Sequence, residues 1–222
     1  MLPFLKNIGC ELSLKLANLH IDLGEVVEAK MLYDDTLTSF SAQISELESR
    51  GASNDEVYKV LRIRKAWGLI HRVALWINRF DLFCHSIAQP KSNITYQRDE
   101  NGKIPSTAIT DSLNDLNEAL ELTHEASTEE EKGCRLIVLL KIIHVMSQTK
   151  TQMGIPMTEA DNKVVADLIE QAADLCPNHD LVLMMKIDMC SLDGRVEDAL
   201  KKCDELAKSR YFSSRCLCCC YD

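Results

Sequence analysis

One phrase is written twice in this chain. Residues 23–37 read LGEVVEAKMLYDDTL, and residues 193–207 read DGRVEDALKKCDELA. In each copy a glycine is followed five residues later by an alanine, and residues with high helix propensity come next. Glycine commonly ends a helix because it adopts positive φ without strain, and an alanine early in the next helix lets two backbones approach closely. The phrase therefore predicts two helical hairpins.

The composition favours helices elsewhere too. The 222 residues are 46% hydrophobic, which is enough to form a core, and only 8 Gly and 5 Pro interrupt the chain. Aromatic residues make up 5%, which is low for a protein of many short strands. We therefore expect an all-α fold.

Apolar residues recur at helical spacing in the first hairpin, which is expected to run over residues 5–23 and 25–48. The first helix has Leu12, Leu16, Leu19 and Leu23. The second helix has Ala29, Leu32, Thr36 and Phe40. These two stripes are predicted to face each other across the hairpin.

A third helix, from residue 53 to about residue 78, is apolar on two faces and is predicted to lie inside the array. Ser53 and Glu56 have the spacing of a capping box at its start. Thr128 and Glu131 have the same spacing before CRLIVLLKIIHVM, a segment so apolar that we expect it to be central. The last helices are predicted over residues 158–175, 180–192 and 195–209.

Two segments lack helical periodicity. Residues 90–105 are polar and bounded by prolines, and they are predicted to form an exposed insertion. Residues 210–222 are predicted to be an unstructured, cysteine-rich tail at an incomplete C-terminal end, because periodicity stops where a capping helix would follow. Residues 1–209 then form a single array of helices.

The sequence contains no motif of a known catalytic centre. A net charge of −9 argues against direct nucleic-acid binding, and no stretch has the length of a membrane span. Cys84 and His85 are adjacent, but neighbours on a helix point in different directions. Six scattered cysteines are predicted to be small buried hydrophobes in a reducing compartment. We expect no enzyme activity, no cofactor, no metal and no small-molecule substrate; a thiol or metal enzyme using Cys84–His85 or the tail is the remote alternative.

Both copies of the phrase resemble the central turn of the tetratricopeptide repeat, a helix–turn–helix unit of about 34 residues. Pro177 precedes Gly194 by 17 residues, which matches the spacing between the proline of one repeat and the turn glycine of the next. Tyr33 stands at the aromatic position, where the last copy has Cys203. The resemblance implies a solenoid of helical hairpins, wound as a right-handed superhelix with degenerate middle repeats, whose concave groove holds other proteins.

Residues 113–209 further resemble the meiotic crossover family of tetratricopeptide proteins, of the Zip-four/Spo-twenty-two type. The similarity lies in LNDLNEALEL, in CRLIVLLKIIHV and in LIEQAADLCPNHDLVLMMKIDMCSLDGRVEDAL. It implies a non-catalytic scaffold that links chromosome-axis and crossover factors in meiotic chromosome synapsis and crossover formation. We expect an intracellular protein, either nuclear and chromosome-associated or cytoplasmic. The alternative is a helical regulatory or structural subunit of another large assembly, such as a cell-cycle ubiquitin-ligase arm.

In such a groove, the contact candidates are polar residues on the first helix of each pair. These are Asn18 and Asp22 in the first repeat and Asp188 in the last. Lys65 and Arg72 join them if the third helix also faces inward, since residues seven apart share a helix face. The alternative for these two basic residues is an ordinary solvated face.

Overall fold

The computed structural model describes most of the chain, and all of its regular structure in that part is helical. The described residues are 3–52, 55–75, 106–149, 156–192, 194–204 and 206–207. The predicted insertion at 90–105, the Cys84–His85 pair and the tail from residue 210 lie outside them. The chain divides into two compact units, Met1–Pro156 and Met157–Asp222.

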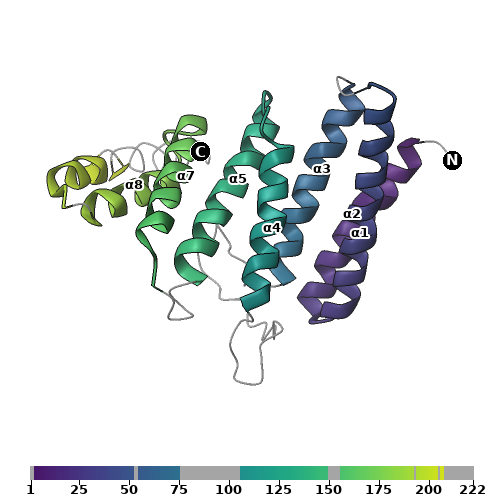
Figure 1. The fold of residues 1–222 in the computed structure, drawn as a ribbon, viewed down its shortest axis with the longest axis horizontal. Coiled ribbons are helices and arrows are strands. Elements are labelled where there is room, and N and C mark those ends of the chain that lie inside the picture. The colour runs from purple at the N-terminus through teal and green to yellow at the C-terminus, as the bar shows by residue number, and fades with distance from the viewer. Residues whose placement is uncertain are drawn as a thin grey trace, which may run out of the picture. The chain divides into compact units, whose positions relative to one another are not determined.

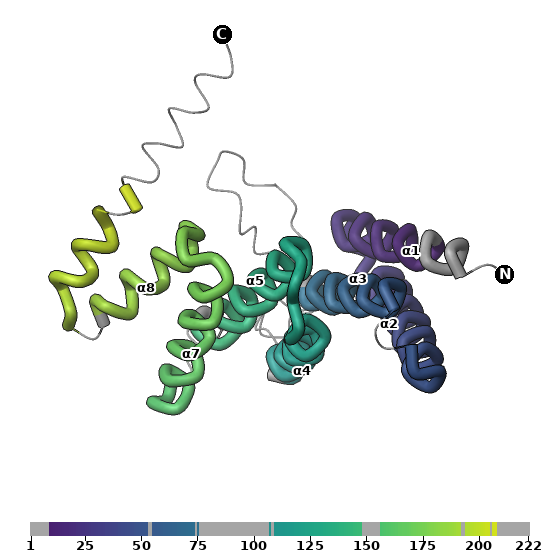
Figure 2. Tube along the Cα trace, turned by 90° about the horizontal axis from the view of Figure 1, so that it is seen from above, coloured from purple at the N-terminus to yellow at the C-terminus, as the bar shows by residue number. Residues whose placement is uncertain are grey.

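The first unit is a row of helices in which each contacts the next (Figure 1). They are α1 (Pro3–Leu23), α2 (Val26–Ser49), α3 (Glu56–Arg72), α4 (Ser106–Leu122) and α5 (Glu129–His144). A short 3₁₀ turn, η1 (Val73–Leu75), continues α3, and a π-helical turn, η2 (Val145–Thr149), continues α5. Seen from above, α1, α3 and α5 follow one another along one side of this unit, and α2 and α4 along the other (Figure 2).

The first copy of the repeated phrase is a Schellman turn. Gly24 has a φ of 80°, its amide donates to the Ile21 carbonyl at 3.0 Å, and the Glu25 amide donates to the His20 carbonyl at 2.8 Å. These bonds satisfy the last carbonyls of α1. The chain then enters α2, where Ala29 is fully buried.

The second copy forms the same turn in the second unit. That unit contains α7 (Glu159–Leu175), α8 (Asp180–Leu192) and a further helical segment at residues 196–204. Gly194 has a φ of 73°, its amide donates to Ser191 at 3.1 Å, and the Arg195 amide donates to Cys190 at 2.8 Å. Ala199 is buried as Ala29 is. The repeated phrase therefore encodes one hydrogen-bonded turn used twice.

The helix starts follow the predicted caps in one case and differ in another. Thr128 and Glu131 form the expected capping box, with the Glu131 amide donating to the Thr128 hydroxyl at 3.2 Å. The prediction that Ser53 caps α3 is wrong: the cap is Asp55, whose carboxylate accepts from the Val57 amide at 3.1 Å. Aspartate at this position also complements the positive end of the helix dipole.

The predicted core face of α1 is wrong. Its four leucines are exposed, and the opposite face is buried, through Cys10, Leu14, Ala17 and Ile21. Because α1 is apolar on both faces, spacing alone does not decide which one packs. The face with the smaller side chains lets α1 approach α2 closely, as the complete burial of Ala17 and Ala29 indicates.

The stripe predicted for α2 is confirmed, since Ala29, Thr36 and Phe40 are buried and Leu32 is partly buried. The apolar segment of α5 is largely buried, although α5 is the last long helix in the row of the first unit. Its buried residues are Cys134, Leu136, Val138, Leu139, Leu140, Ile142 and Ile143.

The cysteines divide into two groups. Cys10, Cys134 and Cys190 are buried as predicted, whereas Cys176 and Cys203 are exposed, so the prediction of small buried hydrophobes is wrong for those two. Cys176 ends α7 as its C-cap, where the helix gives way to the turn at residues 177–178. Its place at a helix end, outside the packed stripe of α7, leaves its thiol in solvent.

The burial of Ala29 generates a test of the α1–α2 packing. We expect Ala29→Glu to lower the free energy of unfolding by a few kcal/mol, because it buries an unpaired charge where two helices meet. Met31, two residues further along the same helix, is 62% exposed. Met31→Glu should therefore change stability by less than about half a kcal/mol in the same urea titration. Similar effects of the two substitutions would contradict this packing.

Candidate functional site

Arg72 joins three helices of the first unit. At the end of α3, its guanidinium donates to both carboxylate oxygens of Asp115 on α4, at 2.9 and 2.6 Å. Its remaining terminal nitrogen donates to Asp34 on α2 at 2.8 Å. The planar fork of arginine suits such bidentate pairing. One side chain therefore holds α2, α3 and α4 together.

Burial and charge pairing oppose each other in setting the pKa values of the three residues in this cluster. The pKa of Asp115 is raised, because burial of its carboxyl outweighs the opposing effect of Arg72. Burial also acts to raise the pKa of the less buried Asp34, but hydrogen bonds and charge from Lys30 and Arg72 outweigh it and lower that pKa. For Arg72, burial acts to lower the pKa, and the two carboxylates more than offset it, so the guanidinium stays charged.

Lys65 lies seven residues before Arg72, about two helical turns away on the same face of α3. It pairs with Glu118 of α4 at 2.5 Å. Both basic side chains therefore point toward the α2–α4 side of α3. Both residues line a smaller cavity of about 320 Å³ between α2, α3 and α4, so their predicted place in a partner groove stays a prediction. Lys65 and Arg72 both form ion pairs with carboxylates of this chain.

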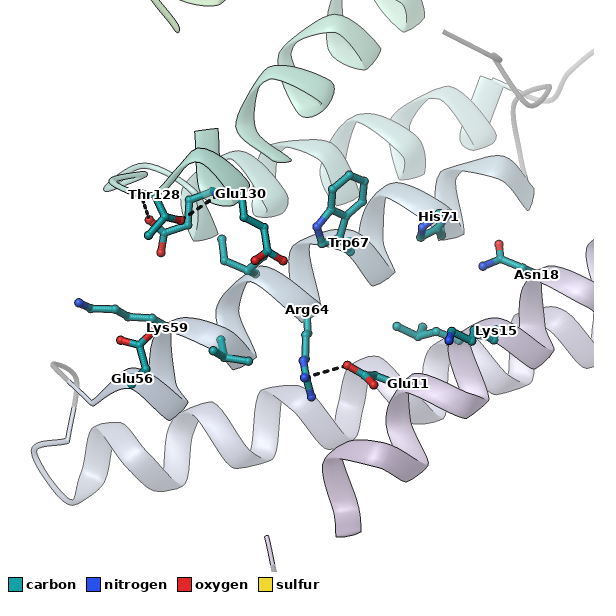
Figure 3. A pocket seen from close by; sticks show the side chains of 14 residues that line it. Glu11, Lys15, Asn18, Glu56, Lys59, Arg64, Trp67, His71, Thr128 and Glu130 are labelled. Atoms are coloured by element: carbon teal, nitrogen blue, oxygen red, sulfur yellow. Dashed lines mark hydrogen bonds and ion pairs between the residues drawn. The ribbon is translucent and has the colours of Figure 1, made fainter. Parts of the chain in front are cut away.

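A separate cavity of about 590 Å³ opens along α3 on a different face, between α1 and the start of α5 (Figure 3). From α1 it is lined by Glu11, Leu14, Lys15 and Asn18. From α3 it is lined by Glu56, Lys59, Val60, Ile63, Arg64, Trp67 and His71, and from α5 and its cap by Thr128, Glu130 and Glu131. We call this cavity the α3 groove. The lining residues of α3 recur at helical spacing and so share one face of the helix. This one helix therefore supplies half of the lining.

The apolar part of the α3 groove centres on Trp67. Its ring stacks on that of His71, with centroids 6.0 Å apart and 30° between planes. Ile63 and Leu14 are buried beneath the groove, while Val60 is 37% exposed. An aromatic surface surrounded by aliphatic side chains is a common anchor site for a protein ligand.

Charged side chains of both signs surround this apolar centre. Arg64 pairs with Glu11 at 2.8 Å and so links α3 to α1 (Figure 3). Within the described part of the chain, Lys15, Lys59 and Glu130 form no ion pair and are exposed. These three charges are therefore available to a bound partner.

The predicted contact residues are distributed unevenly. Asn18 lines the α3 groove, where its side-chain oxygen accepts a hydrogen bond from the hydroxyl of buried Tyr33 at 2.7 Å. Asp22 is exposed on α1, one helical turn beyond Asn18, and does not line the cavity. Asp188 is exposed on α8 in the second unit. Sequence reasoning missed Lys15, Lys59 and Trp67.

Of the missed residues, Trp67 had a detectable signal in the sequence. Glu56, Val60, Ile63, Trp67 and His71 recur at helical spacing and mix polar with apolar side chains. Trp67 lies on one of the two apolar faces of the third helix, and two apolar faces predict a helix that is covered on both sides. The polar residues at both ends of the stripe indicate instead a face that is only partly covered.

The described residues contain no cluster of metal-ligating side chains. No three or more His, Cys, Asp or Glu side chains in that part of the chain gather where they could hold a metal ion. Burial, with a smaller contribution from Glu130, raises the pKa of Cys134 to about 12, so its thiol is protonated at neutral pH. No described helix combines the length and apolar content that crossing a membrane requires.

No protein-family model, no curated protein and no solved structure matches this chain. The function of the site is therefore inferred from its own geometry.

Arg72 allows the ion-pair cluster to be tested. We expect Arg72→Met to lower the free energy of unfolding by about 3–5 kcal/mol, because it leaves Asp115 buried without its partner. Arg50→Met is the matched control, since Arg50 pairs with Glu46 on the exposed surface of α2. That change should cost no more than about 0.5 kcal/mol. Equal losses in chemical denaturation would show that the Asp115 contact does not hold the helices together.

The capping box at the rim of the groove should give a pH signature. The backbone amides of Thr128 and Ser127 donate to Glu131 and lower its pKa below the ordinary value of 4.5. A carboxyl with a lowered folded-state pKa stabilises the fold above its unfolded-state value, and this contribution is lost as the pH falls through the folded-state pKa. Wild type should thus be more stable than Glu131→Gln above the ordinary carboxyl pKa of 4.5, and the difference should shrink as the pH falls through the lowered folded-state pKa. A pH-independent difference in melting temperature would exclude this role.

Proposed function

We propose that this chain is a non-catalytic protein–protein interaction scaffold that holds a partner protein in the α3 groove. The observation that carries the proposal is the lining of that groove by α1, α3 and the start of α5. In a tetratricopeptide-like solenoid, the first helix of each hairpin faces the concave side, where ligands bind. α1 and α3 are the first helices of the successive pairs α1–α2 and α3–α4.

The proposed architecture is a tetratricopeptide-like α-solenoid wound as a right-handed superhelix, with degenerate middle repeats. The identical turns at Gly24 and Gly194 support it, since each is followed by a buried alanine five residues later. Tyr33 is fully buried at the aromatic position of the first repeat, which also agrees with the pattern.

The proposed partner is a protein segment with an apolar or aromatic side chain flanked by charges of both signs. The apolar side chain would insert beside Trp67, and its neighbours would pair with Lys15, Lys59 and Glu130. Buried anchors of this kind supply most of the affinity in protein interfaces, while charged rims mainly set specificity and association rate. Nucleic acid, lipid and small-molecule substrates are not part of the proposal.

A role in meiotic chromosome synapsis and crossover formation, within the nucleus, is the biological setting we propose. It is supported by the resemblance of residues 113–209 to the meiotic crossover family. In the described part of that segment, α4 contacts α5 and α7 contacts α8, which agrees with an array of helices.

The groove can be tested with a matched pair of double variants. Lys59→Glu with Val60→Glu reverses one free charge and places another on the apolar part of the groove. Lys163→Glu with Val164→Glu makes the same changes on α7, where both residues are exposed. We expect affinity purification from the native cell to recover at least about tenfold less partner with the groove variant, and a normal amount with the α7 variant.

Both double variants should melt within a few degrees of wild type, because surface substitutions usually cost no more than about 0.5 kcal/mol each. Undiminished capture by a folded groove variant would refute the proposal for this site. Loss of capture by the α7 variant alone would move the binding surface to the second unit.

A further inference from the structure

The exposed face of α1 has a composition that is unusual for a solvated surface. Leu12, Leu16, Leu19 and Leu23 are 60%, 45%, 57% and 73% exposed. They follow one another at spacings of four, three and four residues, which places all four on one stripe. Single exposed leucines are common, but a contiguous apolar stripe on a soluble domain usually marks an interface.

The stripe lies opposite the face that α1 packs against its own hairpin partner. Cys10, Leu14, Ala17 and Ile21 fill that inner face. A helix that is apolar on both faces is characteristic of a position covered on two sides. Among the described residues, α1 is covered on only one side.

The spacing of the stripe identifies the kind of surface that would cover it. Leucines at alternating intervals of four and three residues form the seam of a two-helix coiled coil, in which each leucine enters a space between side chains of the facing helix. The residues that flank such a seam are Lys15 and Asp22 on one side and Ser13 and His20 on the other. We propose that two copies of this chain associate through α1, packed antiparallel about a twofold axis.

Charge complementarity supports this occupant and this orientation. In an antiparallel pair, the same flank of each helix meets across the seam, so Lys15 of one copy lies beside Asp22 of the other, and the symmetry repeats the contact. In a parallel pair, Lys15 would instead lie beside His20, whose imidazole carries no negative charge. A twofold contact also pairs Leu12 with Leu23 and Leu16 with Leu19, so the stripe is complementary to itself.

This interface adjoins the α3 groove and shares Lys15 with it. The four leucines do not line that cavity, although Lys15 stands at the boundary between the two surfaces. Two grooves on one dimer would give the scaffold two equivalent partner sites.

Sedimentation equilibrium of the full chain under reducing conditions tests the proposal, since the reductant excludes cross-links through Cys176 and Cys203. Wild type should convert from monomer to dimer as its concentration rises from about 1 to 100 μM. Leu16→Glu with Leu19→Glu should raise the dimer dissociation constant about a hundredfold or more and leave helix content unchanged. The control is Val164→Glu with Met184→Glu, two exposed apolar residues of the second unit, which should dimerise as wild type does.

A charge exchange tests the orientation without placing charge on the seam. Lys15→Asp alone should weaken the dimer, and Lys15→Asp with Asp22→Lys should restore it, because the exchanged pair regains opposite charges across the antiparallel contact. A wild-type chain that remains monomeric throughout the concentration range would overturn the proposal. So would a dimer that persists in the leucine double variant, and a failed rescue would exclude the antiparallel arrangement.

Discussion

The three-helix contact made by Arg72 determines how the first unit is built. Its guanidinium reaches α2 through Asp34 and α4 through Asp115, so the two hairpins are joined at one point by directional bonds. Apolar packing alone would allow α3 to rotate or slide between its neighbours, since hydrophobic contact has little directionality. A buried, bidentate ion pair removes that freedom, because any other register leaves a charge unpaired in the interior.

The rotation of α3 that this contact fixes has consequences on its other face. With Lys65 and Arg72 directed toward α2 and α4, helical geometry directs Trp67 and Lys59 toward the space between α1 and α5. The same rotation of α3 therefore places the ion pairs on one face of the helix and the groove on another. Gly68 allows this placement, because a Cβ on it would meet the side chains of Leu37 at 3.0 Å and Leu14 at 3.5 Å. The candidate site thus depends on residues that no partner would touch.

Much of the fold could be predicted from the sequence, because the features involved are local. The turn glycines, the Thr128 cap and the ends of α7 and α8 depend on a few consecutive residues whose conformational preferences are strong. The packed face of α1 could not be predicted in the same way, since its two apolar stripes have the same period. The choice between them depends on which one fits the surface of α2, and that surface is made by residues distant in sequence.

The site was harder to predict than the fold for a related reason. A lysine or arginine on a helix has the same spacing signal whether it meets an acid of its own chain or faces solvent. The sequence offers Lys65 and Arg72 as contact candidates or as a solvated face, because their acidic partners Glu118, Asp34 and Asp115 lie far from them along the chain. Asn18 was placed correctly on the groove side, but its oxygen also fixes Tyr33 within the hairpin. The spacing of residues along one helix does not show which charges pair between helices.

The Schellman turns at Gly24 and Gly194 also bear on how the chain reaches its fold. Each turn closes through hydrogen bonds that span at most six consecutive residues, so its formation requires little loop-closure entropy. Proteins dominated by such short-range contacts fold rapidly, because few distant segments need to meet before the gain in stability begins. The α1–α2 hairpin is complete by Ser49, so it can assemble during synthesis and present a formed surface to α3 as that helix leaves the ribosome.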